Sequence, residues 1–324
     1  MQKAYDVVAL GELLTDFTEE GTDELGNPRF TANPGGAPCN VLAMLAKLGK
    51  RTAFIGKVGD DSFGRELAEA AQSCDIDVTG LRFDPAVPTT SAYIHTLPDG
   101  DREFSFSRDP GADQMLTKEE VDADLIRKTR IFHFGSLSST SEPAREATRY
   151  ALEVAAQAGV WLSFDPNLRE ALWDDPADAR REIGYGLARC DILKISDNEM
   201  EFLTGTRDCD AGVAMLRGMY PLPLIFVTLG AEGSRACYRD RVVSAPPFLR
   251  EDTIETTGAG DAFMGCALSY LLEHGSDDLS DAQLKELLAF ANAGASLVTT
   301  RKGALYVMPD RQEIEDLLSG SRGF

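Results

Sequence analysis

The chain has 324 residues, enough for one large α/β domain or two ordinary ones, and its 43% hydrophobic content can supply a sizeable core. Its formal net charge is −21, from 53 acidic residues against 32 Lys and Arg. Nucleic acid binding needs a net cationic surface, so this charge argues against nucleic acid and against an anionic membrane as partners. An anionic small molecule stays open where local amides, a metal ion and a few bases outweigh the overall field.

The six cysteines are scattered without a CxxC pair, a pattern typical of reduced thiols. The N-terminal residues lead directly into a strand-like run at 5–10, and we find neither a signal peptide nor an apolar stretch of membrane length. We therefore expect a cytoplasmic protein. His133 lies inside the apolar run 131–134, which favours a packed core histidine over a metal ligand.

The region 12–110 mixes two kinds of pattern. Strand-like segments at 13–18 and 29–32, with a hairpin over 91–108 that turns at 98–101, predict a small antiparallel sheet separate from the main one. A helix at 37–48, a strand at 52–55 and a helix at 62–73 return the chain to the main layer. We expect the segments of about 12–34 and 88–110 to form a lid over a cleft.

From about residue 130 onward, short apolar runs alternate with helix-period segments. This alternation predicts an α/β fold with a mainly parallel sheet covered by helices on both faces, in one domain over 1–324. Ligands of such sheets gather beyond the carboxyl ends of the strands. The expected strands are 131–134, 160–164, 192–195 and 224–229, and the expected helices are 142–158, 176–189, 198–204, 210–219, 258–273, 281–298 and 310–318.

The most informative segment runs from Glu255 through Gly258, Ala259, Gly260 and Asp261 into an apolar helix pattern. Glycine amides at a helix N-terminus form an anion site suited to phosphate. An acid beside that site can accept the proton of a hydroxyl that attacks the phosphoryl group. The alternative is that Asp261 only complements the helix dipole.

A second glycine pair, Gly35 and Gly36, opens a helix that carries Asn40. Its amides and the Asn40 side chain suit sugar hydroxyls, but the pattern taken by itself favours a tight strand-to-helix turn with Pro38 near the first helical position. Asp16 is placed on a strand, where it accepts vicinal hydroxyls or is simply solvated.

Two basic residues are placed near the expected cleft. Arg169 follows a strand end and Arg108 closes the lid hairpin, so both guanidinium groups can point into one cleft and hold sugar hydroxyls or a carboxylate. Surface ion pairing in an acid-rich protein is the alternative for each.

Two further strand ends suit a nucleotide. After Lys194, Asn198 and Glu201 have the spacing of a capping box, or reach the metal–phosphate shell through water. Thr228, followed by Gly230 and Gly233, lies against a nucleotide or makes a glycine turn into the hairpin at 235–238.

Taken together, these segments resemble the ribokinase-like (PfkB) family of carbohydrate kinases over essentially the whole chain. The N-terminal family signature matches 35–40 and the C-terminal signature matches 256–263. The stretches 102–113 and 165–173 are most similar to the fructokinase branch, while 2-keto-3-deoxygluconate kinases share part of that pattern.

The resemblance implies a set of roles for this chain. Asp261 is the expected catalytic base, with the amides of Gly258, Ala259 and Gly260 as anion hole. The implied sugar-binding residues are Asp16, Gly35, Gly36, Asn40, Arg108 and Arg169. The implied ATP-binding residues are Lys194, Asn198, Thr228, Gly230, Gly233, Gly258, Gly260 and Asn292, with Glu201 near Mg²⁺ through water. A monovalent-cation (K⁺) site is matched by Glu255, the Thr257 backbone, Arg301 and Gly303.

We therefore expect an ATP-dependent sugar kinase with a three-layer ribokinase-like fold, most similar to fructokinases, that forms a homodimer through its lid. Alternatives are a 2-keto-3-deoxygluconate kinase or another ribokinase-like sugar kinase, and a catalytically inactive regulator that binds sugar or nucleotide. A nicotinamide dehydrogenase would need GxGxxG after the first strand, and the sequence from Gly11 onward lacks it. The family usually has Asp where this chain has Glu255, which leaves activation by K⁺ open.

Overall fold

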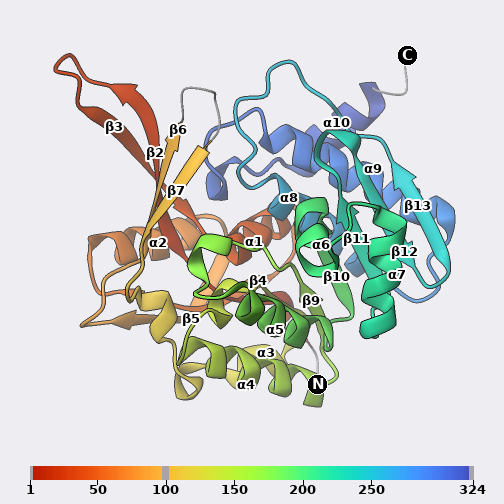
Figure 1. The fold of residues 1–324 in the computed structure, drawn as a ribbon, viewed down its shortest axis with the longest axis horizontal. Coiled ribbons are helices and arrows are strands. Elements are labelled where there is room, and N and C mark those ends of the chain that lie inside the picture. Colours follow the sequence, from red (N-terminus) through yellow and green to blue (C-terminus); the bar gives the residue numbers. More distant parts are fainter. Residues whose placement is uncertain (1–2, 97–101, 321–324) are drawn as a thin grey trace.

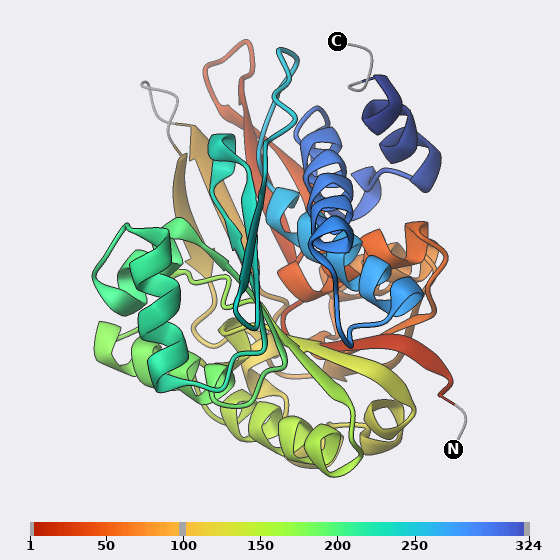
Figure 2. The ribbon, with the colours of Figure 1, turned by 90° about the vertical axis from the view of Figure 1, so that its right-hand side faces the viewer.

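One large sheet with helices on both faces forms the body of the computed structural model, which describes residues 3–96 and 102–320 (Figures 1 and 2). In the described residues this sheet has nine strands in the order β13-β12-β11-β10-β9-β8-β1-β4-β5. All neighbouring pairs from β11 to β5 are parallel, and β12 and β13 add an antiparallel hairpin at one edge. The strands are β1 (Tyr5–Leu10), β4 (Thr52–Gly59), β5 (Ile76–Asp84), β8 (Thr129–Phe134), β9 (Trp161–Phe164), β10 (Ile192–Ser196), β11 (Leu224–Thr228), β12 (Ser234–Tyr238) and β13 (Arg241–Ala245).

Two helical layers cover this sheet, as Figure 2 shows. One layer consists of α1 (Ala37–Lys47), α2 (Ser62–Ser73), α8 (Ala259–His274), α9 (Asp281–Val298) and α10 (Arg311–Gly320). The other consists of α3 (Ala123–Arg127), α4 (Ala144–Gln157), α5 (Pro176–Leu187), α6 (Asp197–Thr204) and α7 (Cys209–Met219). Each layer has its own apolar core, so the strands are hydrophobic on both sides and read as continuous apolar runs. The three-layer α/β fold and its mainly parallel sheet are confirmed.

A separate four-stranded sheet stands beside the main body in the order β3-β2-β6-β7 (Figure 1). Its strands are β2 (Leu14–Thr22), β3 (Pro28–Gly35), β6 (Ser91–Thr96) and β7 (Arg102–Ser107). The expectation that it is antiparallel is wrong at its centre, because β2 and β6 pair in parallel. Between β2 and β6 the chain forms β4 and β5 of the main sheet, and it then returns to the small sheet so that β6 runs in the same direction as β2. The expected turn at 98–101 lies outside the described residues.

The two faces of the small sheet differ in character. Ala92 and Ile94 are buried on one face. On the other face Phe17 stacks on Tyr93 with ring centroids 5.1 Å apart, and Phe63 of α2 meets Phe17 edge-on at 5.5 Å. Across the hairpin, Phe106 pairs with Ala92 and Ser105 pairs with Tyr93, so the alternation that predicted the hairpin separates an apolar face from a face of mixed aromatic and polar residues.

Most expected helices are present to within two residues, and His133 is a packed core residue as expected. It is 1% exposed and its Nδ1 lies 2.9 Å from Ser163 Oγ, while burial lowers its pKa to about 3. The capping-box assignment at Asn198 and Glu201 is wrong: the box is formed by Ser196 and Glu199. The helix begins directly where β10 ends, two residues earlier than the spacing suggested. No helix in the described part of the chain is long and apolar enough to cross a membrane.

Gly36 joins the small sheet to α1 and is the N-cap residue of that helix, with φ of 121°. A Cβ added there would overlap the backbone carbonyl of Glu12, which follows β1. Glycine is therefore required where the two segments come closest.

We expect Gly36→Ala to lower the free energy of unfolding by about 2–5 kcal/mol, because backbone overlap adds to the cost of a positive φ. Gly49→Ala is the matched control, since Gly49 also has a positive φ of 75° but no atom lies within 4 Å of an added Cβ. It should lose only about 1–2 kcal/mol. Urea unfolding of both variants tests this, and equal losses would contradict the steric argument.

Candidate active site

The first cavity, of about 600 Å³, lies between the small sheet and the carboxyl ends of the central strands. Helices α1 and α8 both point their N-termini toward it, because Ala37, Asn40, Gly258 and Gly260 are among its lining residues. The remaining lining residues are Glu12, Leu14, Asp16, Gly36, Ala92, Ile94, Phe106, Leu137, Asn167, Arg169, Lys194, Thr253, Ile254, Glu255, Thr256, Thr257 and Asp261.

Asp261, in the first turn of α8, lies in the wall of this cavity and is 8% exposed. Its Oδ2 accepts a hydrogen bond of 2.8 Å from Nδ2 of Asn40 on α1. The contact joins residues far apart in the sequence because α1 and α8 pack side by side. The carboxylate is thus held by one donor and aimed at a polar cavity.

The electrostatic surroundings of Asp261 favour a proton acceptor. Burial raises its pKa above the usual range of an aspartate, while the hydrogen bond from Asn40 and the charges of Lys194 and Arg169 act in the opposite direction. A carboxylate with a raised pKa is a stronger base than an exposed one, which suits a group that accepts a proton.

Lys194 lies in the middle of β10, and its side chain reaches the turn Gly258–Gly260 at the N-terminus of α8. Its Nζ lies 3.0 Å from Oδ2 of Asp165, and a Cβ added to Gly260 would lie 3.0 Å from the same Nζ. Burial lowers the pKa of Lys194, but the carboxylates of Asp165 and Glu199 outweigh it and raise the pKa above its usual range. Lys194 is therefore a fixed positive charge over the glycine turn.

The second cavity, of about 540 Å³, lies on the other side of that turn. It is lined largely by small and apolar residues, among them Phe248, Leu249 and Phe263. Four residues line both cavities: Lys194, Thr253, Thr256 and Gly260. Two ligands bound in the two cavities would therefore meet at the N-terminus of α8.

The glycine turn gives that helix end the form of an anion site. Gly258 is the N-cap residue in the left-handed conformation, with φ of 78°. The amide of Ala259 donates to Thr256 O at 3.2 Å, and the first bond of the helix runs from Ala262 N to Gly258 O at 2.8 Å. The amides of Gly260 and Asp261 lie between them, where a helix leaves its N–H groups without intrahelical partners.

Several expected sugar-site residues gather around the first cavity. Asp16 lines it, and burial raises the pKa of this carboxyl to about 7 against the opposing charge of Arg169. Gly35 lies so close to Asp16 that a Cβ there would overlap its carboxylate. Arg169 is exposed and lines the cavity. Its guanidinium donates to Asn167 Oδ1 at 2.8 Å, and this hydrogen bond orients the side chain.

Arg108 is not among the residues that line the first cavity. Its guanidinium is buried against Asp113, with Nη2 2.6 Å from Oδ2, and also donates to Leu137 O at 3.0 Å and Thr140 Oγ1 at 2.9 Å. Leu137 lines the cavity. Arg108 therefore holds the loop that carries Leu137 and does not itself reach the cavity, contrary to the expectation that its guanidinium points into the cleft.

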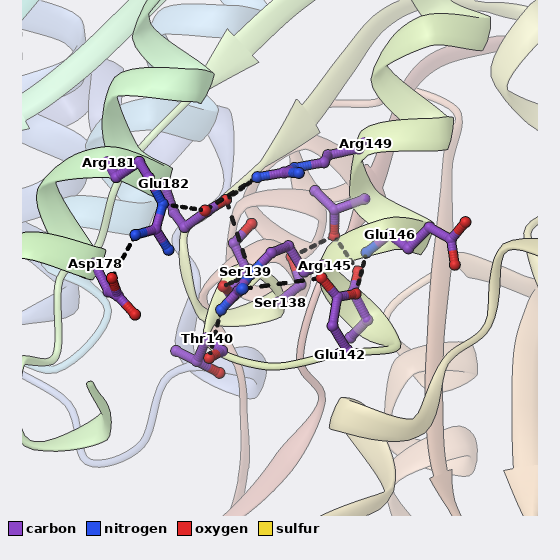
Figure 3. A network of polar contacts seen from close by, with 12 residues as sticks. Ser138, Ser139, Thr140, Glu142, Arg145, Glu146, Arg149, Asp178, Arg181 and Glu182 are labelled. Atoms are coloured by element: carbon purple, nitrogen blue, oxygen red, sulfur yellow. Dashed lines mark hydrogen bonds and ion pairs between the residues drawn. The ribbon is translucent and has the colours of Figure 1, made fainter. Parts of the chain in front are cut away.

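A second arginine holds the same loop from the outside (Figure 3). Arg145 of α4 donates to the carbonyls of Ser139 and Thr140 at 2.8 and 3.0 Å. Its Nε lies 3.8 Å from the buried carboxylate of Glu182, which also accepts from Arg149 at 2.8 Å. The loop between β8 and α4 is thus fixed on both sides by guanidinium groups.

The expected nucleotide residues divide between cavities. Thr228, Gly230, Gly233 and Asn292 line the second cavity. Asn292 donates to Pro246 O at 2.9 Å and accepts from Ser234 Oγ at 2.8 Å, so its amide holds the wall in place.

Asn198 and Glu201 line neither of these cavities. Asn198 lines a neighbouring cavity together with Phe106 and Glu199. Glu201 forms an exposed ion pair with Arg207, with Oε2 2.9 Å from Nε. Within the described residues no group of three or more His, Cys, Asp or Glu side chains is placed to hold a metal ion.

The residues expected around a monovalent cation are partly brought together. Glu255 lines the first cavity, and its Oε1 accepts from the amide of Gly303 at 2.8 Å. Thr257 also lines that cavity. The Arg301 guanidinium turns away to Val307 O and to Glu313 of α10.

Sequence reasoning missed several residues of the first cavity. Glu12 follows β1 by two positions and is 3% exposed, and Leu137 follows β8. Both stand at carboxyl ends of parallel strands, which is the signal that could have identified them. Thr253 and Ile254 come from an irregular segment before the glycine turn and carried no such signal.

Comparison with known proteins identifies the family to which this chain belongs. The pfkB family carbohydrate kinase model matches residues 4–311. The chain belongs to this family. It is 43% identical over 305 residues to probable fructokinase-2 of Arabidopsis thaliana, covering 94% of this chain and 92% of that protein. It is also 41% identical over 314 residues to fructokinase-1 of Zea mays, covering 96% of this chain and 97% of that protein.

Solved structures similar to this pfkB kinase include fructokinases, as do its sequence relatives. Fructokinase from Xylella fastidiosa with bound ATP superposes with a TM-score of 0.89 at 28% identity, covering 99% of this chain and 100% of that one. A double mutant of Vibrio cholerae fructokinase with fructose, ADP and a potassium ion bound gives a TM-score of 0.85 at 29% identity, covering 98% of this chain and 100% of that one. The ribokinase-like fold and the membership of the carbohydrate kinases are thus confirmed.

We expect Asn40→Ala to move the titration midpoint of the Asp261 carboxyl to higher pH. The Nδ2 donor favours the ionised form and so lowers the pKa, and its loss leaves the opposing effect of burial. Carbon NMR of the labelled carboxyl measures the midpoint. Asn33→Ala is the control, because that amide bonds within the small sheet. An unchanged midpoint in Asn40→Ala would refute the assigned role of this hydrogen bond.

Proposed function

We propose that this protein is an ATP-dependent fructokinase that transfers the γ-phosphate of ATP to a primary hydroxyl of fructose. The observation that carries the proposal is the meeting of the two cavities at Gly260, with Asp261 on the side of the first. Sugar in the first cavity and ATP in the second would bring hydroxyl and phosphate together at one helix N-terminus. The fructokinase relatives support fructose as the sugar.

In this mechanism Asp261 accepts the proton of the attacking hydroxyl, and Asn40 orients its carboxylate. The glycine turn at the N-terminus of α8 and the charge of Lys194 stabilise the negative charge that spreads over the transferring phosphoryl group. The amide of Ala259 already donates to Thr256 O. The amides of Gly260 and Asp261 are therefore the donors to the phosphoryl group. Closure of the small sheet over the sugar excludes water and limits ATP hydrolysis.

The second cavity suits a nucleotide by its chemistry. Its apolar wall at Phe248 and Leu249 accommodates a base, while Thr228, Gly230 and Gly233 lie at the end of β11 where a ribose and phosphates would pass. Mg²⁺ binds phosphate oxygens and water and needs few protein carboxylates, which fits a site without an acidic cluster among the described residues. Glu201 would contribute only through water, after leaving Arg207.

A K⁺ ion is proposed beside the glycine turn, where Glu255 and Thr257 line the first cavity and Gly303 donates to Glu255. The potassium ion in the Vibrio cholerae structure supports the proposal. The Arg301 side chain would take no part, since it is bound to α10.

We also propose that residues 1–324 form one kinase domain, with segments of about 12–34 and 88–110 as a lid that moves over the sugar and joins two chains in a homodimer. The small sheet offers Ala92, Ile94 and Phe106 to the cavity, and the stacked rings of Phe17 and Tyr93 lie on its other side. The free state of all six cysteines fits a reducing compartment such as the cytoplasm.

The alternatives differ from a fructokinase in the sugar that they bind or in their lack of catalysis. A 2-keto-3-deoxygluconate kinase would use the same base and glycine turn, and only the sugar contacts would differ. An inactive regulator is disfavoured, because the carboxylate of Asp261 and the glycine turn stand together at the junction of the cavities.

Asp261→Asn should lower kcat by about 10²–10⁴-fold, the contribution of a general base, while sugar and ATP still bind. Asp178→Asn is the control, since that exposed carboxylate pairs with Arg181 on α5 outside the cavities. Steady-state turnover and calorimetric binding give the two quantities. Near wild-type turnover in Asp261→Asn would sink the base assignment.

Among fructose, ribose, 2-keto-3-deoxygluconate and nucleosides, fructose should give the highest kcat/KM. Arg169→Ala should lower that value by roughly 10–100-fold, the usual effect of losing a hydrogen bond from a charged group. Arg180→Ala, which removes an exposed guanidinium bonded to Phe202 O, should leave it unchanged. A higher kcat/KM for another sugar would overturn the fructose assignment, and an unaffected Arg169 variant would return this residue to the surface.

A further inference from the structure

Glu12 is a buried carboxylate that the proposed mechanism does not use. It is 3% exposed, stands between β1 and β2, and lines the first cavity. Its Oε1 accepts from the amide of Ala37 at 3.0 Å, which is the first amide of α1. The N-cap residue of that helix, Gly36, has no side chain to do this, so Glu12 caps α1 from a distant segment.

The two oxygens of Glu12 differ in their hydrogen bonding. Oε2 is buried and has no hydrogen-bond partner in the described part of the chain. An ionised carboxylate accepts several hydrogen bonds and donates none, so a buried oxygen without a donor carries the full cost of desolvation. Burial accordingly raises the pKa of Glu12 to about 7.

A second buried oxygen in the wall of the same cavity also has no hydrogen-bond donor among the described residues. Asn40 Nδ2 donates to Asp261, but Asn40 Oδ1 is buried and has no partner in the described residues. Both Glu12 and Asn40 line the first cavity. Two acceptors without donors in one cavity wall match a ligand that presents hydroxyl groups.

We propose that Glu12 is a specificity-determining residue for the sugar, whose Oε2 accepts a hydrogen bond from one hydroxyl while Asn40 Oδ1 accepts from another. The inference rests on the proposed sugar-kinase function and adds a residue to it. A site built to receive a hydroxyl rejects an analogue that lacks it, because the buried acceptor then stays unpaired. In this proposal Glu12 recognises one hydroxyl of the sugar, different from the hydroxyl that Asp261 deprotonates.

The test uses Glu12→Gln, which keeps the size of the side chain and an oxygen for the Ala37 amide but replaces the free acceptor by an NH₂ donor. The sugar KM should rise about 10–100-fold. The KM for ATP should stay within threefold, because Glu12 does not line the second cavity. Glu12→Asp, with its acceptor withdrawn by one methylene, should raise the sugar KM in the same way and serves if Glu12→Gln is unstable.

Asp61→Asn is the matched control. Asp61 caps α2, accepts from Gly64 N and Thr89 N at 2.8 Å each, and does not line the first cavity. It should lower the melting temperature without changing the sugar KM. If Glu12→Gln behaves in the same way, Glu12 is only a cap and the proposal is overturned.

Fructose analogues that each lack one hydroxyl give the decisive measurement. One analogue should lose affinity with the wild-type enzyme and lose no more with Glu12→Gln, since the two changes remove the same hydrogen bond. Losses that add for every analogue would overturn the proposal. Failure of the wild-type enzyme to phosphorylate any sugar would instead refute the proposed function, so the two failures are distinguishable.

Discussion

The hydrogen bond between Asn40 and Asp261 is the contact on which the site depends, because it joins the N-terminal turns of α1 and α8 across the molecule. Each helix begins at a glycine with positive φ, Gly36 and Gly258, so each delivers bare backbone and a polar side chain to one place. The parallel sheet beneath brings both helix ends to the same edge. Moving either helix by one turn along its axis would separate the Asn40 amide on α1 from the Asp261 carboxylate on α8.

Most of the fold could be predicted because the signals for its helices and strands lie within short stretches of sequence. Helices such as α9 and strands such as β10 follow from apolar periodicity alone, and the glycine turn at Gly258 is visible as a motif. The edge strand β5 was missed, since it is only partly buried and its alternation is broken at Gly80. The parallel pairing of β2 with β6 was also missed, because strand direction depends on what the intervening chain does.

The site was predictable to the extent that motifs mark it. Asp261, Asn40 and Asp16 gather as the family resemblance implied, but Arg108 does not line the cavity, since its charge is neutralised by Asp113 five residues later. No sequence rule distinguishes a guanidinium that meets a ligand from one that fixes a loop. The same limit hid Glu12, whose two oxygens face different surroundings, a distinction that exists only in three dimensions.

The parallel pairing in the small sheet has a consequence for how the protein is made. Thr15 pairs with Ser91, and α1, β4, α2 and β5 all lie between them in the sequence. Closing so long a stretch of chain carries a large entropic cost unless the intervening elements have already folded back. The parallel pairing of β2 with β6 therefore forms after that half of the main sheet. On a ribosome β2 can pair with β3 early, but it cannot pair with β6 until residue 91 has emerged. A nascent chain shorter than that has the signature Gly35–Asn40 but no enclosed cavity.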